Sequence, residues 1–206
     1  MNKITLALCL SFILTGCNTT SSDPNTFTSQ CRYSELLGDP PLTFTVTSVN
    51  EARLDGVICS GSLNAFENML EHFPSVNTFK IKTIPGSADD ETNLALSTVI
   101  HANGITTHIM SGGMVASGGT DLFLAGVERT AEDSTPQIGV HSWSSSDGRN
   151  GNTIPRDDEE HQSYLDYYQT ININPDFYWY TLDAAPADNM HWMTVEEMKY
   201  FHVLTK

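Results

Sequence analysis

The chain has 206 residues, of which 39% are hydrophobic and 17% are charged. This composition is typical of a globular protein with one sizeable core, and it excludes a disordered chain. The formal net charge of −15 disfavours nucleic acids and anionic lipid surfaces as partners. The sequence has no phosphate-binding loop or dinucleotide fingerprint, and its histidines lack zinc-ligand spacing, so we expect neither a cofactor nor a metal site.

The N-terminus has the pattern of an export signal. Lys3 precedes an apolar run from Ile4 to Leu14, which ends at Leu14-Thr-Gly-Cys17. This ending resembles a bacterial lipobox, in which the cysteine is acylated and becomes the mature N-terminus. The resemblance implies that residues 1–16 are removed and that Cys17 anchors the protein to a membrane of the bacterial envelope, facing the periplasm. Asn18 after the cysteine favours the outer membrane, and an ordinary secretory signal is the alternative.

Two cysteines remain for the folded part of the chain, Cys31 and Cys59. In an oxidising compartment two such thiols usually pair, so we predict a structural disulfide, with two buried free cysteines as the alternative. Residues 17–30 are rich in Ser, Thr, Asn and Pro, which predicts a flexible tether between the lipid and a domain formed by residues 31–206.

From residue 43 onward, short strands alternate with amphipathic helices. The expected strands are 43–49, 54–59, 78–84 and 105–110. One helix is expected from Leu63 to Phe73, where Pro74 stops it, and another begins at the acidic residues 89–91 and ends at Asn103. This alternation predicts an α/β fold with largely parallel strands.

The segment from Gly112 to Trp143 organises the chain. Small residues surround Ser117, an apolar run at 122–125 predicts a buried helix, and the strand 138–140 ends at His141. The histidine follows the serine by 141 − 117 = 24 residues. A serine at the start of a helix lies beside free backbone N–H groups, which can bind a developing oxyanion.

This order and spacing resemble the Clp protease proteolytic subunit and the wider Clp/crotonase superfamily, in which an Ala-Ser-X-Gly turn opens a helix and a later strand delivers the base histidine. The resemblance covers residues 55 to 205 and is closest to exported, Clp-like periplasmic proteins. It implies a single domain built as a spiral of ββα units. It also implies that Ser117 is the nucleophile and His141 the base. The alternatives are a helix-capping serine and a core histidine.

The family pattern extends to the remaining site residues. The oxyanion donors would be the amides of Gly118 and of Gly86, although Ser87 stands where the family usually has a second glycine. Asp188 is the expected third triad member, displaced by two residues from strict register, with Asp183 in reserve and a solvated loop carboxylate as the alternative. Asp121 replaces a residue that is usually apolar, and the sequence gives it no role.

After the histidine, we expect a helix over residues 157–173, an aromatic segment at 177–182 packed on the core, and a last helix opened by a capping box at Thr194 and Glu197. Together these features predict a lipid-anchored serine hydrolase, peptidase-like, that acts on a peptide or acyl substrate. An exported chain has no access to an ATP-driven unfoldase, and self-association is compatible with the fold. The alternatives are a non-catalytic binding or assembly module and an esterase or thioesterase.

Overall fold

The computed structural model describes residues 23–36, 38–145 and 147–206, so Cys17 and the predicted signal peptide lie outside the described residues. The chain forms one mixed sheet in the order β1-β2-β3-β4-β5-β7-β8, and β6 also pairs with β5. The strands are β1 (Thr26–Thr28), β2 (Thr43–Val46), β3 (Glu51–Asp55), β4 (Thr78–Ile84), β5 (Thr106–Ala116), β6 (Arg129–Ala131), β7 (Gln137–Val140) and β8 (His191–Trp192).

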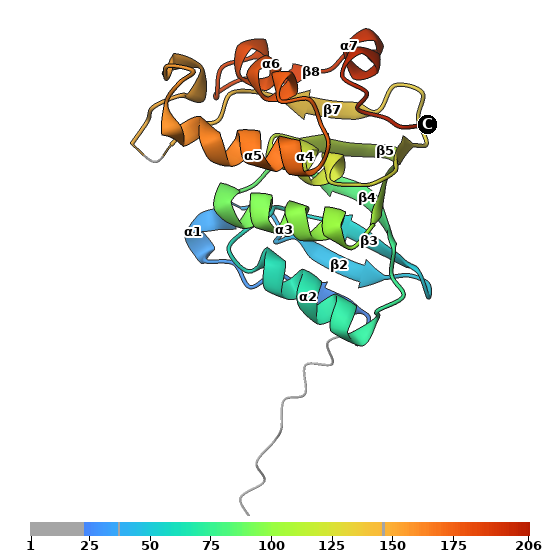
Figure 1. Ribbon diagram of the computed structural model, residues 1–206. Helices are drawn as coiled ribbons and strands as arrows, with labels where there is room; N and C mark the ends of the chain where they lie inside the picture. Colours follow the sequence, from blue (N-terminus) through green and yellow to red (C-terminus); the bar gives the residue numbers. More distant parts are fainter. Residues whose placement is uncertain (1–22, 37, 146) are drawn as a thin grey trace, which may run out of the picture.

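The helices are α1 (Tyr33–Leu36), α2 (Ser62–His72), α3 (Asp90–Ala102), α4 (Gly118–Leu124), α5 (Gln162–Thr170), α6 (Asp176–Ala184) and α7 (Val195–Tyr200). Two short 3₁₀ turns, Gly151–Thr153 and Glu159–His161, precede α5. Figure 1 shows α2, α3, α4 and α5 stacked along one face of the sheet. Within the described residues, no helix is long and apolar enough to cross a bilayer.

The centre of the sheet is parallel, as the alternating pattern predicts. Strands β3, β4, β5 and β7 pair in parallel, and α2, α3 and α4 make the connections between them. Each helix carries the chain to the next strand on the same side, so the chain winds in one direction along the sheet (Figure 1). The α/β prediction is therefore confirmed.

The core lies between this sheet and its helices. Phe79 on β4 packs against Phe44 on β2 and Phe66 on α2, with ring centroids 5.7 and 6.0 Å apart. These three side chains are fully buried, and large aromatic side chains contribute most of the apolar area that a core removes from water.

Four predicted boundaries are corrected. The strand expected at 43–49 ends at Val46, because the Thr47 amide donates to the Glu51 carbonyl in the turn that leads to β3. The strand expected at 54–59 is Glu51–Asp55, because Gly56, with φ +111°, turns the chain at its end. The helix expected at 157–173 starts later, at Gln162, after a 3₁₀ turn. The strand expected to end at Met110 continues to Ala116, because an irregularity in its pairing with β4 takes up the extra residues.

The predicted tether is also too long. Residues 26–28 form β1, which pairs with β2, and the Phe27 ring packs against Phe73 at 5.9 Å. The buried hydroxyl of Ser29 donates a hydrogen bond to the Leu42 carbonyl at 2.7 Å. The Thr-Phe-Thr alternation suits an edge strand, so the ordered domain begins before residue 31.

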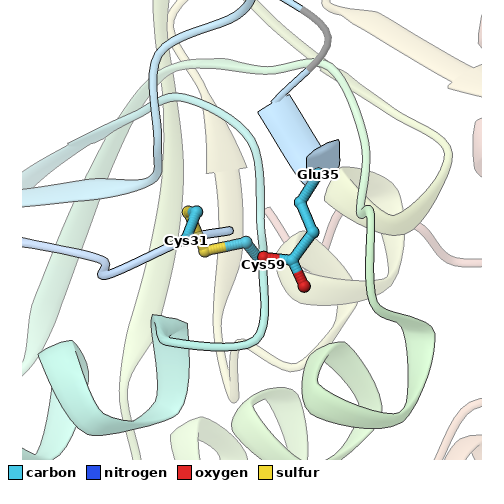
Figure 2. A group of neighbouring side chains, drawn as sticks. All are labelled: Cys31, Glu35 and Cys59. Carbon is cyan, nitrogen blue, oxygen red and sulfur yellow. A yellow bond between two sulfur atoms is a disulfide. The ribbon is translucent and has the colours of Figure 1, made fainter. Parts of the chain in front are cut away.

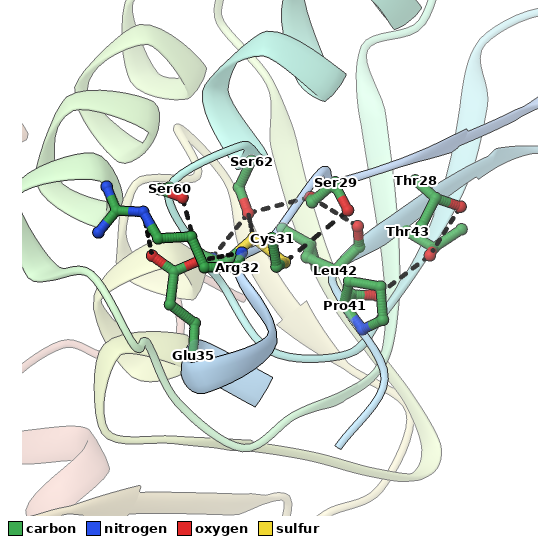
Figure 3. The surroundings of a disulfide bond; sticks show 11 residues. Thr28, Ser29, Cys31, Arg32, Glu35, Pro41, Leu42, Thr43, Ser60 and Ser62 are labelled. Carbon is green, nitrogen blue, oxygen red and sulfur yellow. Dashed lines mark hydrogen bonds and ion pairs between the residues drawn. A yellow bond between two sulfur atoms is a disulfide. The ribbon is translucent and has the colours of Figure 1, made fainter. Parts of the chain in front are cut away.

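The predicted disulfide joins Cys31, just after β1, to Cys59, just before α2 (Figure 3). The Glu35 carboxylate lies beside it and accepts hydrogen bonds from the Ser60 hydroxyl and the Arg32 amide (Figures 2 and 3). Because the two sulfur atoms are bonded to each other, they offer no thiolates that could act with Glu35 as metal ligands.

Loss of this disulfide should lower stability. The two cysteines are 28 residues apart, and the entropy of closing such a loop corresponds to about 3.6 kcal/mol. We expect the double variant Cys31→Ser/Cys59→Ser to lose about that much unfolding free energy in urea. A reductant should destabilise the wild type to the same level and leave the variant unchanged; equal stability of wild type and variant would contradict the expectation.

Candidate active site

Ser117 occupies a sharp turn from strand to helix. β5 ends at Ala116 and α4 begins at Gly118, and between them Ser117 has φ +52° and ψ −131°. A positive φ is strained for a residue with a side chain, and a strained strand-to-helix turn is how several hydrolases expose a nucleophile. The Ser117 side chain makes no capping hydrogen bond to α4, so the structure gives no support to the helix-cap alternative.

Two glycines make this turn sterically accessible. A Cβ atom built on Gly119 would lie 2.2 Å from the Ile84 carbonyl oxygen, at the end of β4. A Cβ atom on Gly118 would lie 2.2 Å from Oγ of Ser87. A side chain at Gly119 would push α4 away from β4, and one at Gly118 would displace the side chains of Ser87 and Asn93. The two glycines therefore let the helix begin close to the sheet and to the start of α3.

His141 reaches the same place from the neighbouring strand. Strands β5 and β7 run parallel, with Ala116 opposite Gly139, so their carboxyl ends lie side by side. Ser117 and His141 line one cavity of about 40 Å³, together with Asp90, Asp121 and aromatic side chains. The structure thus brings the predicted nucleophile and base to one cavity.

Burial lowers the pKa of the His141 imidazole, while the backbone of Ser142 and the charge of Asp90 partly oppose this effect. A lowered pKa keeps the ring neutral at pH 7, which is the form that can accept a proton. Its Nδ1 atom is buried and forms no hydrogen bond within the described residues.

Both predicted oxyanion donors flank the serine. A Cβ atom built on Gly86 would lie 3.5 Å from Cβ of Ser117 and 3.8 Å from its Oγ. Gly118 is the first residue of α4, where helix amides lack intrahelical acceptors. Among the described residues, neither amide donates a hydrogen bond. The amides are therefore available to a ligand beside Ser117.

Ser87, which replaces the usual glycine, makes a specific contact. Its hydroxyl donates a hydrogen bond to Asp90, the first residue of α3, and its side chain lies against Gly118. The Asn93 side chain donates to the Gly118 carbonyl at 3.0 Å from the same helix. The departure from the family pattern therefore couples the start of α3 to the serine turn.

The structure does not bring a predicted third member to the histidine. The loop that carries Asp188 does lie beside His141, because the Ser142 amide donates to the Ala185 carbonyl at 2.8 Å and the Ala187 backbone raises the pKa of the imidazole. Asp188 itself is exposed and does not line the cavity. The reserve residue, Asp183, pairs with Arg156 at 2.9 Å on the exposed side of α6.

This placement gives a quantitative expectation for Asp188. Loss of a buried triad aspartate costs about 10⁴-fold in rate, whereas an exposed carboxylate without a bond to the base should matter much less. We expect Asp188→Asn to slow modification of Ser117 by an active-site probe by less than about tenfold. A loss near the triad value would show that the loop turns the carboxylate onto Nδ1 when substrate binds.

Sequence reasoning missed two acids of the cavity. Asp121 was recognisable only as a departure from the family pattern; its Oδ1 atom accepts a hydrogen bond from the Tyr168 hydroxyl at 2.5 Å. Burial raises the pKa of Asp121 to about 7, the Tyr168 hydrogen bond opposes the rise, and nearby Asp90 adds to it. In the sequence, Asp90 is recognisable only as a negative charge that favours the start of a helix. The Tyr164 hydroxyl, which donates a hydrogen bond to it, lies 74 residues further along the chain.

No protein-family model and no curated protein matches the sequence. Among solved structures, the chain is similar to a mutant of the 1510-N membrane-bound stomatin-specific protease, at 16% identity and a TM-score of 0.49, over 72% of this chain and 73% of the other. The ClpP protease catalytic domain from Plasmodium falciparum is similar at 15% identity and a TM-score of 0.46, over 76% and 80%. An enoyl-CoA hydratase from Shewanella pealeana follows at 10% identity and 0.42, over 79% and 66%. At these identities and TM-scores the likeness does not indicate an activity.

Proposed function

We propose that the protein is a serine hydrolase, peptidase-like, with Ser117 as nucleophile and His141 as base. One observation carries the proposal: the uncapped, strained serine and a half-buried histidine from the end of a separate strand line the same cavity. A serine needs such a base because its hydroxyl is a weak nucleophile at neutral pH.

The reaction follows from these groups. His141 accepts the hydroxyl proton while Oγ of Ser117 attacks the carbonyl carbon, and the oxyanion that forms is stabilised by the amides of Gly86 and Gly118. The imidazolium then gives the proton to the leaving group as the bond to it breaks, which leaves an acyl-enzyme. His141 then takes a proton from a water molecule as its oxygen attacks the acyl carbon. The bond from this carbon to Oγ breaks, the imidazolium returns the proton to Oγ, and the acid product leaves.

The orientation of His141 is proposed to come from the loop at residues 185–191. The antiparallel pairing of His191 with Val140 and the bond between Ser142 and Ala185 hold this loop against the end of β7. Asp188 is retained as a candidate third member that would act only after the loop moves. Neither a cofactor nor an ATP-driven unfoldase is part of the proposal.

The proposed location is the bacterial envelope, with Cys17 carrying the lipid and the domain in the periplasm. The mature protein would then meet peptide or acyl substrates at the membrane surface. Metabolic labelling with an alkynyl fatty acid tests the anchor: incorporation in the wild type, and its loss in Cys17→Ala, are expected. Equal incorporation in both would reject Cys17 as the lipidated residue.

A fluorophosphonate probe on the purified protein tests the activity itself. Labelling of the wild type and its absence in Ser117→Ala are expected; a folded wild type that stays unlabelled would favour a binding module without turnover. Matched amide, oxyester and thioester substrates with the same acyl group then separate a peptidase from an esterase or thioesterase.

A further inference from the structure

The cavity beside Ser117 is unusual in its charge. Two carboxylates line it, those of Asp90 and Asp121, and its lining, all of it within the described residues, includes no lysine or arginine. His141, the remaining basic group there, is held neutral by its lowered pKa. The protein itself therefore supplies no cation to balance these acids.

Both carboxylates are fixed by neutral donors. Asp90 accepts hydrogen bonds from the Ser87 hydroxyl and, at 2.7 Å, from the Tyr164 hydroxyl. Asp121 accepts one from Tyr168, and its Oδ2 atom makes no hydrogen bond among the described residues. Asp121 lies in the first turn of α4, four residues after Ser117, and lines the same cavity. Hydrogen bonds from hydroxyl groups hold the acids in place and leave their charge available.

Aromatic rings also line the cavity, among them those of Trp143, Tyr164 and Tyr178. Trp143 stacks on Tyr164 with ring planes 4° apart, and Tyr164 stacks on Tyr178 with planes 11° apart. The indole N–H of Trp143 donates to the Tyr178 hydroxyl at 2.8 Å, which fixes the rings relative to one another. Aromatic faces attract cations, and the attraction is stronger in a partly desolvated site.

We infer that this cavity binds a cationic side chain of the substrate, ending in an ammonium group, next to the bond that Ser117 attacks. The inference rests on the proposed hydrolase function and adds the substrate class to it. A cavity of about 40 Å³ holds the end of a side chain, since a single water needs 10–15 Å³ by this measure. The aliphatic part of a lysine-like side chain would lie in the mouth of the cavity, and an acidic side chain would be repelled.

The preference of the cavity for a cationic substrate side chain should depend on pH, because Asp121 titrates near neutral pH. The charged group nearest Asp121 is the carboxylate of Asp90, and His141 lines the same cavity in its neutral form. The other titratable groups around it are tyrosine hydroxyls, those of Tyr164, Tyr167, Tyr168 and Tyr178. With a pKa of about 7, Asp121 is protonated below that pH and charged above it. The cavity therefore gains its second negative charge as the pH rises from 6 to 8, and selection of a cation should increase over this range.

The test uses peptidyl diphenyl phosphonates, which modify active-site serines, with either a lysine-like or a norleucine-like side chain. The readout is the ratio of the two inactivation rates for one protein sample, which removes differences in folding and in the reactivity of Ser117. We expect a lysine-to-norleucine ratio of about ten or more at pH 8 in the wild type, because a hydrogen bond to a charged partner contributes about 1.5–3 kcal/mol. The ratio should fall as the pH is lowered to 6.

The informative variant is Asp121→Asn, whose amide oxygen can still accept from Tyr168. It should reduce the ratio at pH 8 several-fold and remove its pH dependence, and Asp90→Asn should also reduce the ratio. Asp157→Asn is the matched control, because Asp157 is exposed, does not line the cavity and carries the same charge; its ratio should equal that of the wild type.

The results distinguish an error in the cation pocket from an error in the hydrolase proposal. If the wild type reacts with a neutral fluorophosphonate but prefers norleucine, or if Asp121→Asn keeps the full ratio, the cation pocket is wrong and the hydrolase proposal stands. If the folded wild type reacts with no phosphonate of either kind, the hydrolase proposal fails, and the inference fails with it.

Discussion

Replacing His141 with glutamine is expected to slow the reaction of Ser117 with a neutral fluorophosphonate about a thousandfold. General base catalysis contributes 10²- to 10⁴-fold, and no other basic side chain lines this cavity within the described residues. The wild-type rate should rise with pH and level off with a midpoint below the ordinary histidine value of about 6.5. The sign follows from burial, which lowers the pKa of His141 and so keeps the base form populated at lower pH.

The matched control is His72→Gln, because His72 is exposed and lies outside the cavity, with its ring bonded to the Asn68 carbonyl of its own helix and near the Phe27 ring. This variant should keep the wild-type rate and pH midpoint. A His141→Gln variant that is folded by circular dichroism and reacts at the wild-type rate would show that His141 is a core histidine. A neutral probe is needed because Asp121 also titrates near pH 7 and would affect a charged one.

Gly119→Ala is expected to be the most destabilising single substitution of those considered. The new Cβ atom would lie 2.2 Å from the Ile84 carbonyl oxygen and 2.8 Å from its Cγ2 atom, so α4 would have to move away from β4. Overpacking of this kind costs about 3 kcal/mol, which is a large fraction of the stability of an ordinary domain. The same shift would displace Ser117, so labelling should fall with stability.

Gly104→Ala is the control that separates the effect of a steric clash on stability from the effect of a positive φ. A Cβ atom on Gly104 would meet no atom within 4 Å, but its φ of +67° is unfavourable for alanine and should cost about 1 kcal/mol. In urea unfolding, the unfolding free energy of Gly119→Ala should therefore be well below that of Gly104→Ala. Equal stability of the two variants would show that the start of α4 can shift at little cost.

Local sequence patterns anticipated those parts of the protein that local interactions determine. The strand at 78–84 has the predicted bounds, because Pro85 ends it and alternating Phe79 and Ile81 face the core. The last helix opens with the predicted capping box, in which Thr194 and Glu197 each accept a hydrogen bond from the other's backbone amide. The disulfide could be predicted because the sequence, with its predicted signal peptide and lipidation site set aside, has only Cys31 and Cys59.

Long-range contacts explain what the sequence did not reveal. The extension of β5 past Met110 depends on carboxylates from the loop after β6. The Glu132 carboxylate accepts a hydrogen bond from the Ser111 amide, and the Asp133 carboxylate accepts one from the Gly112 amide. The exposed position of Asp188 depends on how the loop at 185–191 is tied to β7. Neither feature has a periodic signal, because the partners lie more than twenty residues apart.

The sequence by itself determined the alternation of strands and helices, the turn that holds Ser117, and the pairing of Cys31 with Cys59. These depend on side-chain periodicity, on residues that permit or stop a helix, and on how many cysteines are available. Only the tertiary structure decided which side chains meet His141 and which acids and aromatic rings surround Ser117. The reason is that Asp90, Asp121 and Tyr164 come from three different helices, and only the packing of α3, α4 and α5 over the ends of the parallel strands brings them to one cavity.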